Sequence, residues 1–499
     1  MAIAEEDGQT AQYDTKPLGR LKAASRFIDR IYVERGIDSL QDNSQNKCSH
    51  GCPYFDPLSI QPILIRLHAA AAAHTKGRPV SSLFESQVEQ IRTEFPALAR
   101  EMNGQPVVYF DGAAGTQVHQ TVISAITDYL CHRNANHEGL FATSLESDAM
   151  LAEVHQAAAD FLGADDPDCV SFGPNMTTLT LALSRAMARQ WQPSDEIIVT
   201  RLDHDANVRP WLLAAEDAGA VVKFVEIHRE DCTLDLSSFE QALSKRTRLV
   251  AVGLASNAVG TINPLKQMIE SAQAHGALTF VDAVHWGPHQ LIDVAQLNCD
   301  FLACSAYKFF GPHIGMLWGR RGLLESMSAY KLRPASDSLP GKWMTGTQNH
   351  ECLEGTLAAF HYLADLGRRV IDDDALSARE ALKHAYRAIA EYESKLIWQL
   401  IDGLKQIPGI KVWGITDPAR SAERLPTLAL THNKKTASQL ARELASAGIF
   451  AWHGNYYALE LTESLGLEPE GMLRLGVVHY NTQAEIVRVL EELERICGA

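Results

Sequence analysis

Short apolar runs alternate with helix-length amphipathic segments through the middle of this chain. Each run is continuous rather than alternating, which is typical of strands buried on both faces of a parallel sheet. Seven such runs occur, at residues 169–172, 197–200, 221–227, 249–254, 278–281, 301–304 and 316–318. They predict a large α/β domain over residues 89–340, built on a mostly parallel seven-stranded sheet.

The pattern changes after residue 340. Helical periodicity covers residues 353–367 and 375–403, and short strands and a closing helix at 483–496 follow. This predicts a smaller α+β domain over residues 341–499. Residues 89–110 precede the first run and could pack with this smaller domain.

Residues 1–88 have a different, mostly helical pattern, and we treat them as an appended segment. Within it, Cys48, His50 and Cys52 lie in a loop where they could form half of a zinc site. Their spacing is loose and no second cysteine pair follows, so an ordinary loop is favoured. We therefore expect no metal.

Composition and charge narrow the class of protein. The 499 residues, 46% of them apolar, supply enough material for a large core. A net charge of −16 disfavours nucleic acid and anionic membranes as partners. No apolar run reaches the roughly 18 to 20 residues of a membrane span. The nine cysteines form no repeating framework, and the acidic N-terminus lacks a secretory signal pattern, so we expect a cytoplasmic protein.

Two residues at the ends of neighbouring runs carry candidate chemistry. Asp282 follows the run 278–281, and Lys308 lies in the glycine-terminated turn after the run 301–304. In open α/β sheets, ligands bind outside the carboxyl ends of the strands. Lys308 could form a Schiff base with pyridoxal 5'-phosphate (PLP), and Asp282 could keep the pyridine nitrogen protonated. Either residue alone would be an ordinary loop residue, but together they favour a PLP enzyme.

A candidate phosphate site precedes a predicted helix at residues 179–187. The segment Gly173-Pro174-Asn175-Met176-Thr177-Thr178 follows a strand and opens this helix. Free backbone N–H groups at a helix start attract anions, and threonine hydroxyls add hydrogen bonds. The alternative is that a threonine simply caps the helix.

These motifs, with the blocks at 109–116 and 472–482, resemble the class V aminotransferases of PLP fold type I, in their cysteine desulfurase-like branch. The resemblance implies PLP as cofactor and a small amino acid as substrate. It also implies that Thr177, Thr178, Ser305 and Tyr307 bind the cofactor phosphate. Tyr307 stands where the family usually has histidine, so it can donate a hydrogen bond but adds no positive charge.

The same resemblance implies roles for four further residues. His204 would stack on the pyridine ring and relay protons, and Asn257 would lie near the ring oxygen and the substrate carboxylate. His285 would face the ring hydroxyl, although core packing is an alternative role. Arg474 lies in an apolar strand and would bind the α-carboxylate, which would supply the partner that a buried cation needs.

The segment at Gly346 and Thr347 resembles one that crosses a two-fold axis to the neighbouring subunit's phosphate. It implies a homodimer with shared active sites. The alternative is a helix cap before Leu353 within one chain.

One departure from the family changes the expected reaction. Tyr457 stands where desulfurases carry the loop cysteine that becomes a persulfide, and no cysteine occurs between Cys352 and Cys497. Tyrosine cannot hold a persulfide. The sequence therefore favours a lyase that eliminates at Cβ. Tyr457 would lie at the substrate, and Tyr457, Tyr456 or His453 would protonate the leaving group or seal the pocket from water. The alternatives are a desulfurase using another thiol, an aminotransferase, an amino-acid epimerase, or a catalytically silent scaffold.

Overall fold

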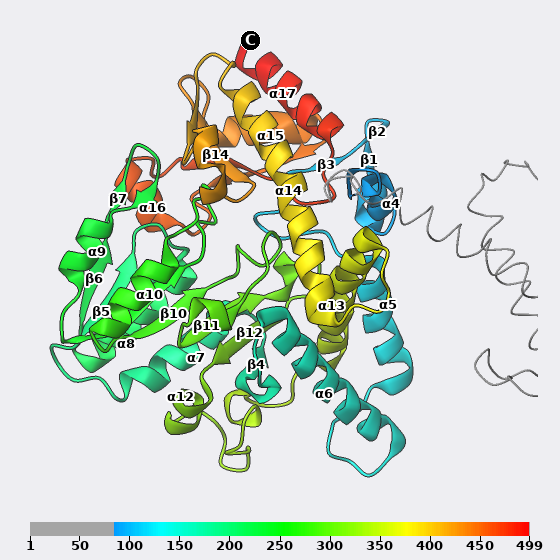
Figure 1. The fold of residues 1–499 in the computed structure, drawn as a ribbon. Helices are drawn as coiled ribbons and strands as arrows, with labels where there is room; N and C mark the ends of the chain where they lie inside the picture. The colour runs from blue at the N-terminus through cyan, green and yellow to red at the C-terminus, as the bar shows by residue number, and fades with distance from the viewer. Residues whose placement is uncertain (1–83, 499) are drawn as a thin grey trace, which may run out of the picture. The chain divides into compact units, whose positions relative to one another are not determined.

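The computed structural model describes residues 84–498 (Figure 1). The predictions for most of the appended segment, including Cys48 and Cys52, lie outside these residues.

A seven-stranded sheet forms the centre of the larger part, in the order β4-β12-β11-β10-β9-β5-β6. All neighbouring pairs are parallel except those that β12 makes with β4 and β11. The prediction of a mostly parallel sheet in an α/β fold is confirmed. The strands are β4 (Val170–Gly173), β5 (Glu196–Thr200), β6 (Val221–Val225), β9 (Thr247–Gly253), β10 (Leu278–Asp282), β11 (Phe301–Ser305) and β12 (Gly315–Gly319).

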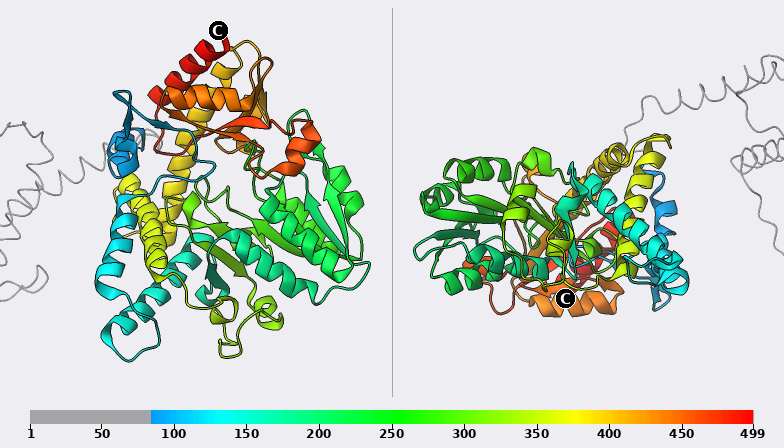
Figure 2. Two further views of the ribbon diagram at one scale, coloured as in Figure 1. Left: turned by 180° about the vertical axis from the view of Figure 1, so that it is seen from behind. Right: turned by 90° about the horizontal axis from the view of Figure 1, so that it is seen from below.

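Helices cover both faces of this sheet, which explains why its strands are continuously apolar (Figure 2). Phe280 packs with Trp211 and Leu183 on one face, whereas the adjacent Val281 belongs to the core on the other. Helices α7 (Met176–Ala188), α8 (Arg209–Ala218) and α12 (Arg321–Ser326) contribute to the first face. The second face has α6 (Ala142–Leu162), α9 (Leu236–Ala242), α10 (Leu265–Ala274), α13 (His350–Ile371) and α14 (Ala378–Leu404).

A four-stranded antiparallel sheet forms the smaller part, in the order β13-β14-β17-β16. Apolar residues of α15 and α17, such as Leu444 and Val489, share a buried core with Leu473 and Leu475 of β17. Arg474 lies between these two leucines and therefore points to the other face of the sheet. The elements are β13 (Ile410–Trp413), β14 (Thr427–His432), α15 (Ala437–Ser446), β16 (Trp452–Gly454), β17 (Met472–Gly476) and α17 (Gln483–Gly498).

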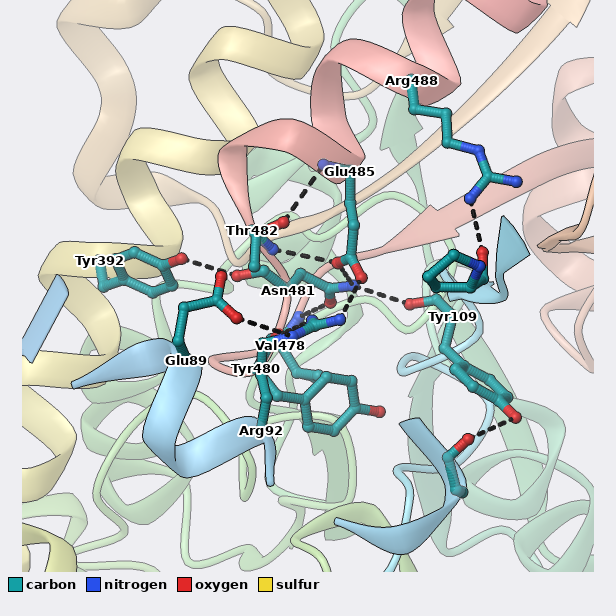
Figure 3. A network of polar contacts seen from close by, with 12 residues as sticks. Glu89, Arg92, Tyr109, Tyr392, Val478, Tyr480, Asn481, Thr482, Glu485 and Arg488 are labelled. Atoms are coloured by element: carbon teal, nitrogen blue, oxygen red, sulfur yellow. Dashed lines mark hydrogen bonds and ion pairs between the residues drawn. The ribbon is translucent and has the colours of Figure 1, made fainter. Parts of the chain in front are cut away.

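A polar network joins the start of the described chain to its end (Figure 3). Arg92 of α4 (Val88–Arg92) pairs with Glu485 of α17 at 2.9 Å, and the side-chain amide of Asn481 donates to the Tyr109 carbonyl at 2.9 Å. Strand β3 (Val108–Tyr109) also pairs in parallel with β15 (Ile449–Phe450). Together these contacts position the following loop, residues 111–116, beside Lys308.

Short elements complete the description. They are β1 (Glu101–Met102), β2 (Gln105–Pro106), α5 (Gln120–Asp128), β7 (Ile227–His228), β8 (Thr233–Leu234), α11 (Val294–Leu297) and α16 (Leu459–Leu465). Among residues 84–498, no helix is both long and apolar enough to cross a membrane.

Candidate active site

Five strands of the large sheet end at one cavity. The empty space inside it and at its open mouth is about 530 Å³. The segments that follow β4, β5, β9, β10 and β11 all contribute to its wall. Parallel strands bring their carboxyl ends to the same edge, which is why residues far apart in sequence meet here. The predicted site residues that line it are Thr177, His204, Asn257, Asp282, His285, Ser305, Tyr307 and Lys308.

Lys308 and Asp282 are both buried in this cavity wall. Lys308 ends the short 3₁₀ helix η6 (Ala306–Lys308), and its side-chain amine donates to the Ala113 carbonyl at 2.6 Å. Burial and the nearby Arg474 cation lower the pKa of Lys308 to about 7. Burial raises the pKa of Asp282 to about 6, although the Val284 backbone N–H and Lys308 oppose this. The lysine is thus partly neutral near pH 7, as a nucleophilic amine requires.

The start of α7 forms the anion-binding side of the cavity. Asn175 caps this helix by accepting from the backbone N–H and hydroxyl of Thr178, at 2.8 and 2.9 Å. Thr177 lines the cavity, whereas Thr178 does not. Ser305 accepts from the Met176 backbone N–H at 3.0 Å and so ties β11 to the helix start. The capping residue is therefore Asn175, which leaves the Thr177 hydroxyl available to an anion.

His204 lies at the cavity rim under the ring of Tyr457. Their ring centroids are 5.4 Å apart at 25°. The Ala206 backbone N–H donates to His204 Nδ1 at 3.0 Å, so the proton of the neutral imidazole is on Nε2. Burial, with Lys308 and Arg474 nearby, lowers the pKa of His204 to about 3. The side chain is therefore a neutral, flat surface at neutral pH.

The loop that carries Tyr456 and Tyr457 has strained backbone geometry. Both residues have positive φ, 55° and 59°, which costs a non-glycine residue about 1–2 kcal/mol. Two hydrogen bonds stabilise the loop: the Asn257 amide donates to the Tyr456 carbonyl at 3.0 Å, and the Asp205 backbone N–H donates to the Tyr457 carbonyl at 2.6 Å. Tyr457 is 71% exposed and is not in the cavity wall.

Arg474 is a buried cation that donates to a backbone carbonyl. It donates to the Asn257 carbonyl at 2.9 Å, and its guanidinium lies 4.3 Å from the Tyr456 ring centroid. Within residues 84–498 no carboxylate lies within ion-pair distance of it, although the Asp111 carboxyl is close enough to favour its charged form. Burial lowers its pKa to about 10, so it stays charged at neutral pH. A buried guanidinium that is not hydrogen-bonded to a carboxylate of its own chain is suited to a carboxylate ligand.

Sequence reasoning missed two groups at this site. Asp203 lines the cavity and accepts from the Thr200 hydroxyl and the Gly253 backbone N–H, at 2.8 and 2.7 Å. Burial, and to a lesser extent Asp282, raises its pKa to about 7. The other group is the Ala113 carbonyl. The position of Asp203 directly after a strand was a usable signal, whereas nothing local marks a backbone carbonyl.

Four predicted site residues do not line the cavity: Thr178, Thr347, Tyr457 and Arg474. Thr347 is exposed. Its proposed contact with a neighbouring subunit's phosphate stays a prediction.

The residues present suit PLP. The cavity combines a buried amine, a buried carboxyl group and the start of a 13-residue helix. It also contains two buried polar atoms without a hydrogen-bond partner in the described chain, Asn257 Oδ1 and His285 Nε2. These could bind a polar aromatic ligand through its ring oxygen and nitrogen substituents.

Comparisons with known proteins agree with the fold and with PLP as the cofactor. Residues 108–489 match the family described as aminotransferase class-V. A cysteine desulfurase of Pectobacterium carotovorum is 32% identical over 424 residues, covering 82% of this chain and 98% of the relative. The aminotransferase-like protein FGM3 of Gibberella zeae is 32% identical over 421 residues, with the same two coverages. The crystal structure of the Escherichia coli cysteine desulfurase CsdA aligns with a TM-score of 0.70 and 26% identity, over 82% of this chain and 98% of that one.

The fold and the site thus define a PLP-dependent enzyme of fold type I. The chain belongs to the class V aminotransferase family and is cysteine desulfurase-like within it.

Proposed function

We propose that this enzyme is a lyase that eliminates a sulfur-containing leaving group from Cβ of a small amino acid. The observation that carries the proposal is the tyrosine loop. Tyr457 stacks on His204 beside the cavity, and residues 353–496 contain no cysteine that could accept sulfur. Without an acceptor thiol, sulfur is best released with the carbon group attached to it.

Substrate binding is assigned to Arg474 and Asn257. The Arg474 guanidinium would bind the α-carboxylate, and the unpartnered Asn257 Oδ1 could accept a hydrogen bond from the ligand. Because Arg474 comes from the small sheet and Asn257 from the large domain, a bound carboxylate would also bridge the two parts.

Lys308 is assigned the proton transfer at Cα. When bound, PLP supplies an electron sink for the negative charge that develops there. Lys308 would bind the cofactor covalently, and its amine would take the Cα proton once the substrate has replaced it. The pKa of about 7 leaves a large fraction of this amine unprotonated at neutral pH.

Tyr457 is assigned the protonation of the leaving group. The Cβ–S bond breaks as Lys308 takes the Cα proton, and the sulfur takes a proton from the Tyr457 hydroxyl. The neutral His204 ring positions Tyr457 by stacking on it. The products are a thiol and 2-aminoacrylate, which water converts to pyruvate and ammonia. Transamination would instead need an amino acceptor, such as a second keto acid.

The test is product analysis on S-alkyl cysteines with the wild type and Tyr457→Phe. The wild type should form thiol, pyruvate and ammonia in equal amounts. Tyr457→Phe retains the stacking on His204 but loses the acid, so kcat should fall about 10² to 10⁴-fold while KM changes little.

The matched control is Tyr330→Phe, since Tyr330 is an exposed tyrosine, 53% accessible, outside the cavity wall. Alanine plus elemental sulfur from cysteine, or a keto acid formed only with an amino acceptor, would contradict elimination.

We also propose a homodimer. The region from α5 to the start of α6 exposes five large apolar side chains, Ile123, Leu130, Leu140, Phe141 and Leu145, with Leu140 98% accessible. The same region contacts the segment after Thr347, because the Ala135 carbonyl lies 3.2 Å from His350 Nδ1. Exposed apolar patches of this kind mark association sites.

Replacing Leu140 and Phe141 by glutamate is expected to convert the dimer to a 54.9 kDa monomer in sedimentation equilibrium. Two buried charges at an apolar contact would outweigh its favourable burial. Leu332→Glu is the matched control, because Leu332 is 72% accessible but lies in another segment. A monomeric wild type would contradict the dimer.

A further inference from the structure

The turn that carries His285 is attached to the long helix α14 by two buried contacts. Tyr386 donates its hydroxyl proton to the Gly287 carbonyl at 2.6 Å. Two helical turns later, Glu393 accepts from His289 Nδ1, with 2.9 Å between Oε2 and Nδ1. His285 is therefore positioned by a helix that does not itself reach the cavity wall.

The His289–Glu393 pair is almost completely buried, with both side chains 1% exposed. Burial raises the pKa of Glu393, whereas His289 and the His479 backbone N–H favour its ionised form. Replacing a buried pair with apolar residues is often neutral or stabilising, so stability by itself does not explain this one. A role in the neighbouring site would explain it.

His289 lies directly against the His285 ring. The two ring centroids are 5.5 Å apart at 73°. Each ring has a buried Nε2 that lacks a hydrogen-bond partner in the described chain. Buried nitrogens without partners are rare in proteins, and here two of them lie on adjacent rings between a carboxylate and the cavity.

The carboxylate determines where the proton of His289 lies. An ionised Glu393 accepts the Nδ1 proton, so Nε2 of neutral His289 carries a lone pair. A buried lone pair next to His285 favours a proton on the neighbouring imidazole. Carboxylate–histidine contacts orient reactive histidines in this way at metal and catalytic sites.

We propose that Glu393 and His289 are positioning residues that fix the proton of His285 and transmit the Glu393 charge to the wall of the cofactor cavity. The inference rests on the proposed cofactor site at Lys308 and does not depend on elimination chemistry. The protonation of the His285 imidazole would thus depend on the charge of Glu393.

Other titratable groups also lie near His285 and set the background for this effect. Burial disfavours a positive charge on His285, and so would a positive charge on His289 of its own turn, Lys308, Arg474 or His204. Asp282 and Asp203 are the acids in the same cavity wall. Ionised Glu393 adds a negative charge behind His289, to which it is hydrogen-bonded.

The experiment is a pH titration of the yellow absorption of the lysine-bound cofactor, without substrate, in the wild type and Glu393→Gln. The substitution keeps the shape of Glu393 but removes its negative charge. Negative charge favours protonated forms nearby, so its loss should lower the titration midpoint by about 0.5 to 1 pH unit. In a His285→Gln background, Glu393→Gln should cause no further shift of the midpoint, because Glu393 is proposed to act on the cofactor through His285.

Glu196→Gln is the matched control. Glu196 is also a 1% exposed glutamate in a buried ion-pair cluster, with Lys223 at 2.7 Å and Arg246 at 2.6 Å, but it lies at the opposite end of β5 from the cavity. It should lower stability without moving the midpoint. An unchanged midpoint in Glu393→Gln would overturn the inference, as would an equal shift with and without His285. Failure of elimination alone would leave the titration result intact.

Discussion

Lys308→Ala is expected to abolish the yellow absorption of the bound cofactor and to lower turnover by about 10³-fold or more. The substitution removes both the amine that would bind the cofactor covalently and the base at Cα, and general base catalysis alone contributes about 10² to 10⁴-fold. Folding should be retained, because the Lys308 amine makes one hydrogen bond, to the Ala113 carbonyl. Absorption spectra and steady-state rates of the purified variant measure both effects.

The matched control is Lys342→Ala. Lys342 is buried to a similar degree, 8% exposed against 7% for Lys308, and also donates to one backbone carbonyl at 2.6 Å. It lies outside the cavity wall, so its replacement should leave the absorption unchanged. Yellow absorption that persists in Lys308→Ala, or is absent from the wild type, would contradict the assignment of Lys308.

Arg474→Met is expected to lower kcat/KM for the amino-acid substrate by about 10² to 10⁴-fold. A charge-assisted hydrogen bond contributes about 1.5–3 kcal/mol, and a guanidinium offers two of them to a carboxylate. The loss should be specific to the carboxylate. The wild type should therefore prefer an amino acid over the corresponding amine, and the variant should lose that preference.

The stability of Arg474→Met provides a second readout. Arg474 is a buried cation with no carboxylate at ion-pair distance in the described chain, so its replacement should not lower the substrate-free melting temperature. Arg424→Met is the control, because Arg424 is equally buried but donates to the carbonyls of Ile415 and Thr427. It should lose stability and keep the preference for the carboxylate. Retention of that preference in Arg474→Met would contradict our assignment.

The edge of the sheet where the chemistry lies was predictable from the chain itself. Asp282 and Lys308 follow apolar runs typical of buried parallel strands, and parallel strands place their carboxyl ends together. His204, Asn257 and Ser305 also follow strands. The family resemblance predicted these three near the cofactor, and each of them lines the cavity.

The orientation and burial of individual side chains could not be predicted from the sequence. Thr177 and Thr178 were predicted to act together, but Asn175 caps α7 and engages the hydroxyl of Thr178. Whether a hydroxyl points to a ligand or back to its own helix start depends on a few dihedral angles. Asp203 was not predicted as a site residue, because its burial and the raised pKa that follows from it depend on the tertiary structure.

The sequence by itself determined the parallel sheet, the order of its strand ends along the chain and the absence of an acceptor cysteine near Tyr457, because these follow from periodicity and residue identity. Only the tertiary structure decided that Arg474 contacts Asn257, that Tyr457 lies on His204, and that Glu393 reaches His289 across 104 residues. Such contacts depend on how separate elements pack, and short-range patterns carry no information on that packing.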